Sequence, residues 1–336
     1  SENHPPLQVS RCTKAGGCVS STQSITLDAN WRWLHNSQGS NCYTGNTWNQ
    51  ASCPDPLTCA QQCFLDSANY EGVYGITSSG NSLRLNFVTQ SANKNVGSRN
   101  YLLNSAGTQY ESFNLKGKEF TFTVDVSNLP CGLNGALYFS EMPADGGLSA
   151  TNTAGAPYGT GYCDAQCPHD VKFIQGQANI VNWKPDSNNP NTGRGQWGSC
   201  CAELDVWEAN SISEAYTPHV CSNAGLHKCV TAEDCGDGDN RHTGACDKDG
   251  CDFNPYRMGV SQFYGPGLVV DTTKPFTVVT QFLTTDGTSA SDLVEIRRSF
   301  VQNGVVHGNP VSTFAPIPYD SVTDSYCAAQ KSLFGD

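Results

Sequence analysis

Three carboxylates within six positions are the feature of this chain that most directly suggests chemistry. Glu203, Asp205 and Glu208 lie in the run CCAELDVWEAN at residues 200–210. Cleavage of a glycosidic bond requires one carboxyl group that holds a proton beside another that stays ionised. Crowded acids suit this requirement, because mutual repulsion and burial both raise carboxyl pKa values. We therefore predict a catalytic carboxylate site in this run.

The segment that carries the three acids has the pattern of a buried strand. Residues two apart share one face of a strand, so Glu203 and Asp205 point the same way, with apolar residues behind them. Glu208 is five positions after Glu203, and a regular strand would direct it to the opposite face. A one-residue bulge near Val206 or Trp207 would return it to the same face, and bulges often occur beside active sites.

Two other interpretations of the acids stay open at this point. Most acids in proteins are solvated surface groups, although Leu204, Val206 and Trp207 within the run favour burial. Buried acids are costly unless they are paired or functional. Clustered oxygens also suit a hard cation such as calcium. We rank catalysis first, metal binding second and a solvated face last.

Composition limits the classes of function. The chain has 336 residues, enough for one large β domain or two ordinary ones. Its formal net charge of −12 excludes nucleic acid as an expected partner, whereas a neutral polymer is compatible with it. The apolar runs are too short to cross a bilayer, so we expect no membrane association. Nothing in the sequence indicates a dimer, and we expect a monomer.

The 17 cysteines indicate a disulfide framework and therefore a secreted, extracellular protein. Zinc sites usually show C-x-x-C repeats, and the sequence has none, so we expect no metal and no cofactor. The first residues lack a basic start and an apolar stretch, and we expect any signal peptide to have been removed. Because 17 is odd, one thiol is free or its partner lies outside this chain.

Alternating apolar and polar residues predict strands in four segments, at residues 83–88, 120–126, 276–282 and 293–296. Turn signals follow at 79–81, 106–107, 116–117, 286–287 and 303–304. Residues 56–66 are the best helix candidate. This pattern predicts an all-β fold, an antiparallel β-sandwich of the jelly-roll type, as a single domain over residues 1–336. The long loops at 185–198 and 227–254 are expected to be functional.

The sequence resembles the family-seven glycoside hydrolases. The resemblance rests mainly on the motif E-x-D-x-x-E within CCAELDVWEANS at residues 200–211. Further fragments match in the same order: DANWRW (28–33), GNTW (45–48), LPCGLNGALY (129–138), GTGYCD (159–164), GQAN (176–179) and NPYR (254–257). Each fragment alone is weak, but their shared order along nearly the whole chain is specific.

The resemblance implies a jelly roll with a groove or tunnel lined by disulfide-stapled loops, and retaining hydrolysis of β-1,4-glucan. By motif position, Glu203 is the nucleophile, Glu208 is the acid/base, and Asp205 orients and supports Glu203. His219 matches a histidine near the acid/base, although without the family we would interpret it as structural. The expected partner is cellulose or a cello-oligosaccharide.

Sugar rings present flat C–H faces that bind to aromatic platforms. Trp31 and Trp33 match tryptophans of the glucan path, and as residues two apart they would share a strand face, although core packing is equally open. Further positions that match the groove are Arg99, Asn134, Tyr138, Tyr162, Asp164, Gln166, Lys172, Arg241 and Arg257. For the basic residues of this set, solvated surface is the alternative.

Loops bear on exo or endo action. Residues 187–195 resemble a loop that roofs the tunnel of cellobiohydrolases, and residues 235–244 resemble a loop that covers the catalytic centre, slightly shortened and without an aromatic tip. We therefore favour a cellobiohydrolase with a more open tunnel. An endoglucanase of the same fold is the alternative, and a non-catalytic glucan-binding lectin is a third, disfavoured by the three carboxylates. The acidic run at 237–252 lacks EF-hand spacing, which disfavours a calcium loop.

The resemblance also implies a disulfide pairing. The family continues beyond residue 336, and it pairs Cys131 with a cysteine of that further segment. We accordingly expect the chain to lack its C-terminal segment, and we see no cellulose-binding module or linker in it. The expected bridges are Cys12–Cys18, Cys42–Cys63, Cys53–Cys59, Cys163–Cys201, Cys167–Cys200, Cys221–Cys246, Cys229–Cys235 and Cys251–Cys327.

Overall fold

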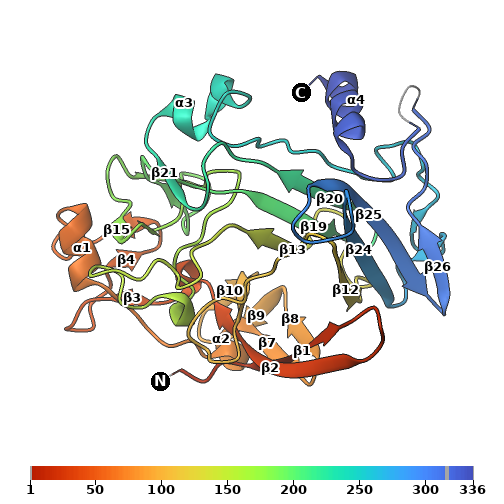
Figure 1. Cartoon of the computed structure of the whole chain (residues 1–336). Coiled ribbons are helices and arrows are strands. Elements are labelled where there is room, and N and C mark those ends of the chain that lie inside the picture. The colour runs from red at the N-terminus through yellow and green to blue at the C-terminus, as the bar shows by residue number, and fades with distance from the viewer. Residues whose placement is uncertain (1, 315–317, 336) are drawn as a thin grey trace. The chain divides into compact units, whose positions relative to one another are not determined.

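The computed structural model describes residues 2–314 and 318–335 (Figure 1). Its contacts divide the chain into two compact units. Unit 1 comprises Ser1–Ser112, Glu141–Cys201 and Asn223–Asn240, and unit 2 comprises Phe113–Ser140, Ala202–Ser222 and Arg241–Asp336. None of the helices in the described ranges combines the length and the apolar character that a membrane span needs.

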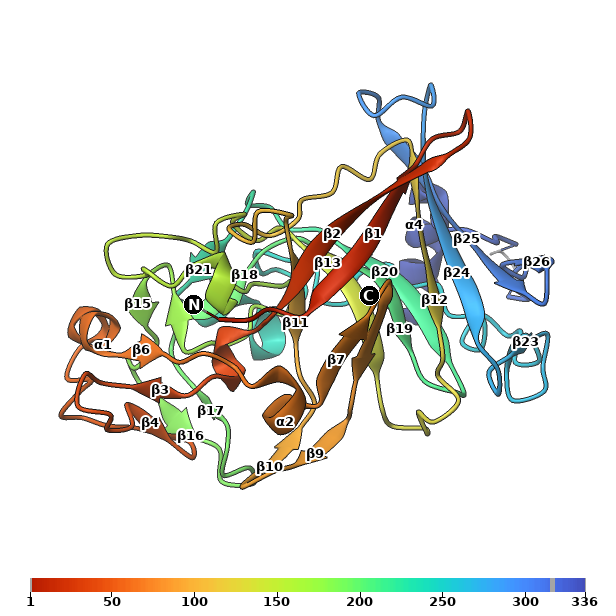
Figure 2. The ribbon, with the colours of Figure 1, turned by 90° about the horizontal axis from the view of Figure 1, so that it is seen from below.

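Unit 2 contains two antiparallel sheets (Figure 2). One sheet has the order β12 (Lys118–Val124), β24 (Phe276–Thr284), β25 (Leu293–Gln302) and β26 (Val305–Gly308). The other has the order β13 (Gly135–Ser140), β19 (Glu203–Ala209) and β20 (Glu214–His219). A short parallel pair, β22 (Tyr264–Gly265) with β23 (Val270–Asp271), and helix α4 (Asp324–Phe334) complete its regular elements among the described residues.

The core of unit 2 lies between these sheets. Val206 and Tyr216 of the three-stranded sheet pack with Phe282 and Ile296 of the four-stranded sheet, and a second cluster surrounds Trp207. Burial alternates strictly along β24, as expected for a strand with one face on a core. The predicted β-sandwich is therefore confirmed in this unit, including the strands expected at 276–282 and 293–296. The strand expected at 120–126 is present as β12, which ends two residues earlier, at Val124.

Unit 1 is built around the antiparallel sheet β1 (Pro6–Cys12), β2 (Cys18–Leu27) and β11 (Asn100–Leu103). Its other strands pair in twos: β3 (Leu34–His35) with β6 (Phe64–Leu65), β4 (Tyr43–Thr44) with β5 (Thr47–Trp48), β7 (Ile76–Ser79) with β8 (Ser82–Leu85), β9 (Val88–Gln90) with β10 (Lys94–Val96), β14 (Phe173–Ile174) with β15 (Gln177–Ala178), β16 (Lys184–Pro185) with β17 (Gly193–Arg194), and β18 (Gly198–Cys200) with β21 (His227–Cys229). Its helices are η1 (Ala29–Trp31), α1 (Pro56–Gln62), α2 (Tyr70–Tyr74), η2 (Ala156–Tyr158), α3 (Ala232–Cys235) and η3 (Gly238–Asn240).

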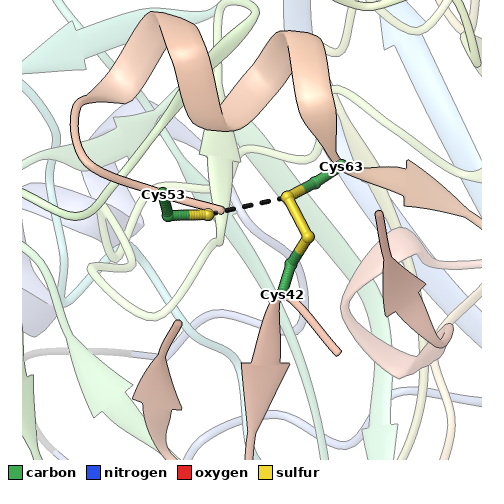
Figure 3. Close-up of side chains that lie close together, drawn as sticks. All are labelled: Cys42, Cys53 and Cys63. Atoms are coloured by element: carbon green, nitrogen blue, oxygen red, sulfur yellow. Dashed lines mark hydrogen bonds between the residues drawn. A yellow bond between two sulfur atoms is a disulfide. The ribbon is translucent and has the colours of Figure 1, made fainter. Parts of the chain in front are cut away.

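Disulfides hold the helix predicted near residue 56. Helix α1 begins at Pro56 after the capping side chain of Asp55, and it ends at Gln62, four residues before the expected end. Cys59 within the helix is bridged to Cys53, and Cys63 at its end is bridged to Cys42. In Figure 3 the Cys53 Sγ lies beside the Cys42–Cys63 bridge, 3.6 Å from the Cys63 Sγ.

All eight expected disulfide pairs are present, and Cys131 is unpaired and exposed. The Asn303–Gly304 turn between β25 and β26 is also as expected. Both residues have positive φ, 53° and 76°, which is the reason that an Asn-Gly pair suits a two-residue hairpin.

The strand predicted through residues 83–88 is wrong as a continuous element. β8 ends at Leu85, and the backbone N–H of Asn86 donates to the carbonyl of Gly75 before β9 begins at Val88. Leu85 and Phe87 are 45% and 48% exposed, so the alternation there does not mark a core-facing strand. Alternation reports two faces of a strand only where the chain stays extended.

Candidate functional site

The bulge expected in the strand of the three acids is present at Val206. Tyr138 on β13 is paired with Asp205 and the preceding residue Leu137 with Trp207, so Val206 has no partner on that strand. On β13, positions 136, 138 and 140 share one face, and they are paired with Glu208, Asp205 and Glu203. The three carboxylates therefore share a face, while Val206 and Trp207 both pack in the core behind them.

His219 at the end of β20 binds the central acid of this row. Its Nε2 lies 3.2 Å from the Asp205 Oδ2, and its Nδ1 lies 2.8 Å from the Asp247 carbonyl oxygen. The side chains of His219 and Asp205 are each 7% exposed. Because both ring nitrogens face acceptors, the ring is placed to donate from both as an imidazolium. Burial lowers the pKa of His219, but the hydrogen bonds to Asp205 and Asp247 and the charge of Glu203 outweigh it and raise the pKa to about 9.

Gly250 allows the loop at residues 247–250 to approach His219 closely. Gly250 has φ +68°, and a Cβ added there would lie 2.6 Å from the His219 Nδ1 and equally close to the Thr217 side chain. Any other L-residue would be strained in this conformation and would displace the ring. The carbonyl of Asp247 reaches His219 only because the loop can lie this close.

Glu208 has a different environment from Asp205. It is half-buried, and its Oε1 accepts a hydrogen bond of 2.9 Å from the Asn134 Nδ2, while the Asn134 Oδ1 accepts from the Ala209 N–H at 3.1 Å. Burial and the nearby charge of Asp205 raise the pKa of Glu208, and the bond from Asn134 and the charge of His219 oppose this only in part. A carboxyl with a raised pKa is suited to donate a proton.

Glu203 is the first residue of β19 and is half-buried. Its cross-strand neighbours are Ser140 on β13 and His219 on β20. One carboxylate oxygen of Glu203 lies within 4.8 Å of the nearest ligand atoms of both Asp205 and His219. The Ser140 Oγ is buried without a hydrogen-bond partner among the described residues, and sequence analysis missed this neighbour because serine in a strand carries no signal of its own.

A pocket of about 220 Å³ adjoins Glu208. Its lining includes Asn134, Glu208, Asn210, Ser213 and Asn254. These side chains offer amide and hydroxyl groups beside a carboxyl with a raised pKa, a combination that suits a polyhydroxylated ligand.

Glu203, Asp205 and His219 are close enough together to be considered as metal ligands. A histidine binds a metal through a ring nitrogen with a free lone pair, whereas the Nε2 of His219 faces Asp205 and its Nδ1 faces the Asp247 carbonyl. The arrangement therefore favours proton chemistry over metal binding.

Arg241 and Arg257, predicted as groove residues, take part in ion pairs within unit 2. Arg241 lies 2.5 Å from the Asp249 Oδ1, and Arg257 pairs with Asp252. Asp249 and Asp252 of this loop thus have cationic partners. Tyr138 lies opposite Asp205 on the face of the three acids.

Four predicted groove residues form one cluster in unit 1. The Arg99 guanidinium lies 3.3 Å from the centroid of the Tyr162 ring and 5.5 Å from that of Trp31, and it pairs with Asp28 at 3.0 Å. The Tyr162 hydroxyl donates to Asp164. The Arg99 guanidinium therefore contacts aromatic rings and a carboxylate, and the alternative of a freely solvated arginine is wrong at this position.

The two tryptophans do not share a strand, and this expectation is corrected. Trp31 ends the 3₁₀ helix η1, in which the Asp28 side chain accepts from the Asn30 N–H at 2.6 Å, and Trp33 follows outside any strand. Capping by an aspartate immediately before the segment overrides the alternating pattern. Trp33 is 46% exposed, and its ring centroid lies 4.2 Å from that of His35, with the two rings tilted by 30°. It presents an accessible aromatic surface rather than a core side chain.

Lys172 and Gln166 also lie in unit 1. The Lys172 Nζ donates to the Asn30 carbonyl at 2.8 Å and lies 4.7 Å from the Tyr43 ring centroid. Burial lowers the pKa of Lys172 to about 8, against the opposing charges of Asp28 and Asp170. Gln166 is exposed, and its backbone N–H donates to the Asp164 Oδ1 at 2.8 Å.

The loop at 187–195 is ordered by side-chain contacts within unit 1. It is carried by the β16–β17 pair, and the Asn46 Nδ2 donates to the carbonyls of Asp186 and Asn189 at 3.0 and 3.2 Å. The Trp183 Nε1 in turn donates to the Asn46 carbonyl at 2.9 Å. The GNTW fragment noted in the sequence thus anchors this loop.

Comparison with known proteins agrees with this geometry. The model of "Glycosyl hydrolase family 7" matches residues 1–336. A family 7 cellobiohydrolase from Daphnia pulex is 51% identical, with a TM-score of 0.97 over 100% of this chain and 78% of that one. A cellobiohydrolase from Melanocarpus albomyces complexed with cellotetraose is 44% identical, with a TM-score of 0.93 over 100% and 77%. The Humicola insolens endocellulase EGI is 40% identical, with a TM-score of 0.85 over 99% and 79%.

These likenesses also confirm the jelly-roll type of the sandwich predicted from the sequence. With a family model that matches the whole chain and a row of three carboxylates on one face of a bulged strand, the chain belongs to glycosyl hydrolase family 7 and is a glycoside hydrolase.

Proposed function

We propose that this chain is a secreted, monomeric cellobiohydrolase that cleaves β-1,4-glucosidic bonds of cellulose with retention of configuration, and that residues 1–336 act as one catalytic domain. The observation that carries the proposal is the bulge at Val206, because it puts Glu208 on the face of Glu203 and Asp205. A retaining mechanism needs two carboxyl groups on one sugar, and a regular strand would separate them.

In the first step, Glu203 attacks the anomeric carbon, the bond from that carbon to the glycosidic oxygen breaks, and the oxygen takes the proton of Glu208 and leaves as a hydroxyl group of the departing sugar. The raised pKa of Glu208 supports its role as the acid. In the second step, Glu208 takes a proton from water, which then hydrolyses the glycosyl ester of Glu203. Asp205, held by His219 at 3.2 Å, orients Glu203, and the imidazolium offsets part of the negative charge in the row.

Each unit, taken by itself, carries residues that are suited to contact sugars. In unit 1, Trp33 offers an exposed ring face, and the Arg99 guanidinium lies against the rings of Trp31 and Tyr162. Asp164, Gln166 and Lys172 of unit 1 carry groups that can bond hydroxyls, and in unit 2 such groups are carried by Asn134, Tyr138, Arg241 and Arg257. The cellotetraose in the Melanocarpus albomyces structure supports a cello-oligosaccharide as the ligand.

Exo action is favoured over endo action by two observations. The identities to the two cellobiohydrolases, 51% and 44%, exceed the 40% to the endocellulase. The loop at 187–195, which resembles a tunnel-roofing loop, is anchored by Asn46. An endoglucanase of the same fold is the second candidate, supported by the TM-score of 0.85 to the endocellulase. The eight disulfides support secretion.

Two measurements test the proposal. The Glu203→Gln variant should lose hydrolysis of cellulose by at least about 10³-fold while it still binds cellulose, and Glu119→Gln, an exposed position on β12, is the matched control. Undiminished turnover of Glu203→Gln would refute the assignment. Product analysis separates the two modes: mainly cellobiose from crystalline cellulose supports exo action, and a rapid fall in the viscosity of a soluble cellulose derivative supports endo action.

A further inference from the structure

A charged side chain occupies the apolar face of β25 directly behind the carboxylate row. The side chains of Ile296, Arg298 and Phe300 share the inward face of this strand, and Arg298 is 1% exposed. Burying a guanidinium is costly unless it is paired and fully bonded. Its place between the two sheets of unit 2 therefore calls for a specific role.

The contacts of Arg298 extend to three other strands. Its Nη2 donates to the carbonyl of Val206 on β19, its Nη1 lies 3.2 Å from the Glu214 Oε2 on β20, and its Nε donates to the Thr280 Oγ1 on β24 at 3.1 Å. The guanidinium carbon lies 4.4 Å from the centroid of the Tyr216 ring. Each of the three kinds of guanidinium nitrogen thus has an acceptor.

Val206 is the bulged residue that has no partner on β13. A bulge interrupts the hydrogen-bond ladder, and a buried carbonyl without a donor costs free energy. Arg298 supplies that donor from the opposite sheet. The same guanidinium also contacts Glu214, so it links the bulge to β20. Glu214 is paired with Ala209, the residue after Glu208.

We propose that Arg298 is a positioning residue that holds the β19 bulge and thereby keeps Glu208 directed at the glycosidic oxygen. The inference rests on the proposed role of Glu208 as the acid. Glu214 balances the buried charge, and burial raises the pKa of Glu214 while Arg298 opposes that rise. A buried ion pair can often be replaced by apolar residues without loss of stability, so the pairing with Glu214 does not explain why Arg298 is there. The contact that a positioning role requires is the hydrogen bond to the Val206 carbonyl.

The test compares two substrates that differ only in their need for an acid. A cellobioside with a poor leaving group, such as phenol, needs a proton from Glu208, whereas a dinitrophenyl cellobioside does not. The double variant Arg298→Met, Glu214→Leu removes both buried charges. We expect kcat/KM on the phenyl substrate to fall about 10–100-fold, because a displaced acid loses part of the roughly 10²–10⁴-fold that general acid catalysis contributes. On the dinitrophenyl substrate we expect kcat/KM to fall by less than about threefold, because kcat/KM reports the first step alone and not the attack of water, for which Glu208 is the base with either substrate.

The control is Arg297→Met on the same strand. Arg297 is the neighbouring residue, its side chain is 53% exposed, and it pairs with Glu295 at 2.7 Å, so its loss should leave both substrates unaffected. Equal losses on both substrates in the double variant would show a purely structural role and overturn the proposal, as would no loss on either.

Two further variants keep the outcome clear. Thr280→Val removes only the acceptor of the Arg298 Nε, and it should cause a smaller but still selective fall, about two- to fivefold on the phenyl substrate. If the double variant does not fold and Thr280→Val shows no selective fall, the proposal is overturned. Glu208→Gln is measured in parallel: if it retains activity on the phenyl substrate, the proposed function fails, independently of Arg298.

Discussion

Asn134 controls the proton of Glu208 in a way that can be measured. Its Nδ2 donates to the Glu208 Oε1 at 2.9 Å, and this bond opposes the rise in the pKa of Glu208 that burial and Asp205 cause. The Asn134→Ala variant removes the donor. A hydrogen bond to a charged group contributes about 1.5–3 kcal/mol, and 1.36 kcal/mol corresponds to one pKa unit. Water can replace part of the bond at this partly exposed site, so we expect the pKa of Glu208 to rise by roughly 0.5–1 unit.

The assay is the pH profile of kcat/KM on a soluble cello-oligosaccharide. The alkaline limb reports loss of the proton from the acid, so it should move to higher pH by that amount. Asn134→Asp keeps the size of the side chain but adds a negative charge, and it should move the limb further in the same direction. Asn128→Ala, an exposed asparagine whose Nδ2 contacts only the neighbouring Ser127 Oγ at 3.5 Å among the bonds described, is the control.

An alkaline limb that stays in place or moves to lower pH in Asn134→Ala would refute this reasoning. A fall in kcat/KM with no change in the shape of the profile would show instead that Asn134 contacts substrate and does not set the pKa of Glu208.

Three further results are expected. Removing the Cys251–Cys327 bridge, which closes a separation of 76 residues, should lower the free energy of unfolding by about 4 kcal/mol in denaturant titrations; a loss below about 1 kcal/mol would contradict the loop-entropy estimate. His219→Gln should lower the free energy of unfolding by roughly 3 kcal/mol below pH 6.5, and this charge-dependent loss should disappear as the pH rises through 9, because the raised pKa stabilises the folded state only while the ring is protonated; a pH-independent difference between variant and wild type would argue against this. Gly250→Ala should lower kcat and stability by more than Gly304→Ala, whose added Cβ meets nothing within 4 Å, and equal costs in the two would exclude displacement of His219.

Parts of the site were predictable because they depend on local rules. The bulge at Val206 follows from the spacing of Glu203 and Glu208, since only an extra residue brings positions five apart to one face. Arg298 could have been noticed as a charge at an inward position of an alternating strand, but its acceptor on Val206 lies 92 residues away in sequence. The Trp31–Trp33 expectation was wrong because a capping aspartate three residues before Trp31 starts a 3₁₀ turn.

The sequence by itself determined the β class, the disulfide-stapled character and the family, because alternation, cysteine content and the order of motifs are properties of the chain. Tertiary structure supplied the surroundings that raise the pKa of Glu208, and it placed His219 against Asp205. The physical reason is that burial and hydrogen bonds come from residues distant in the chain, such as Asn134 and Asp247, and a carboxyl group's pKa is set by those neighbours rather than by its own position in a motif.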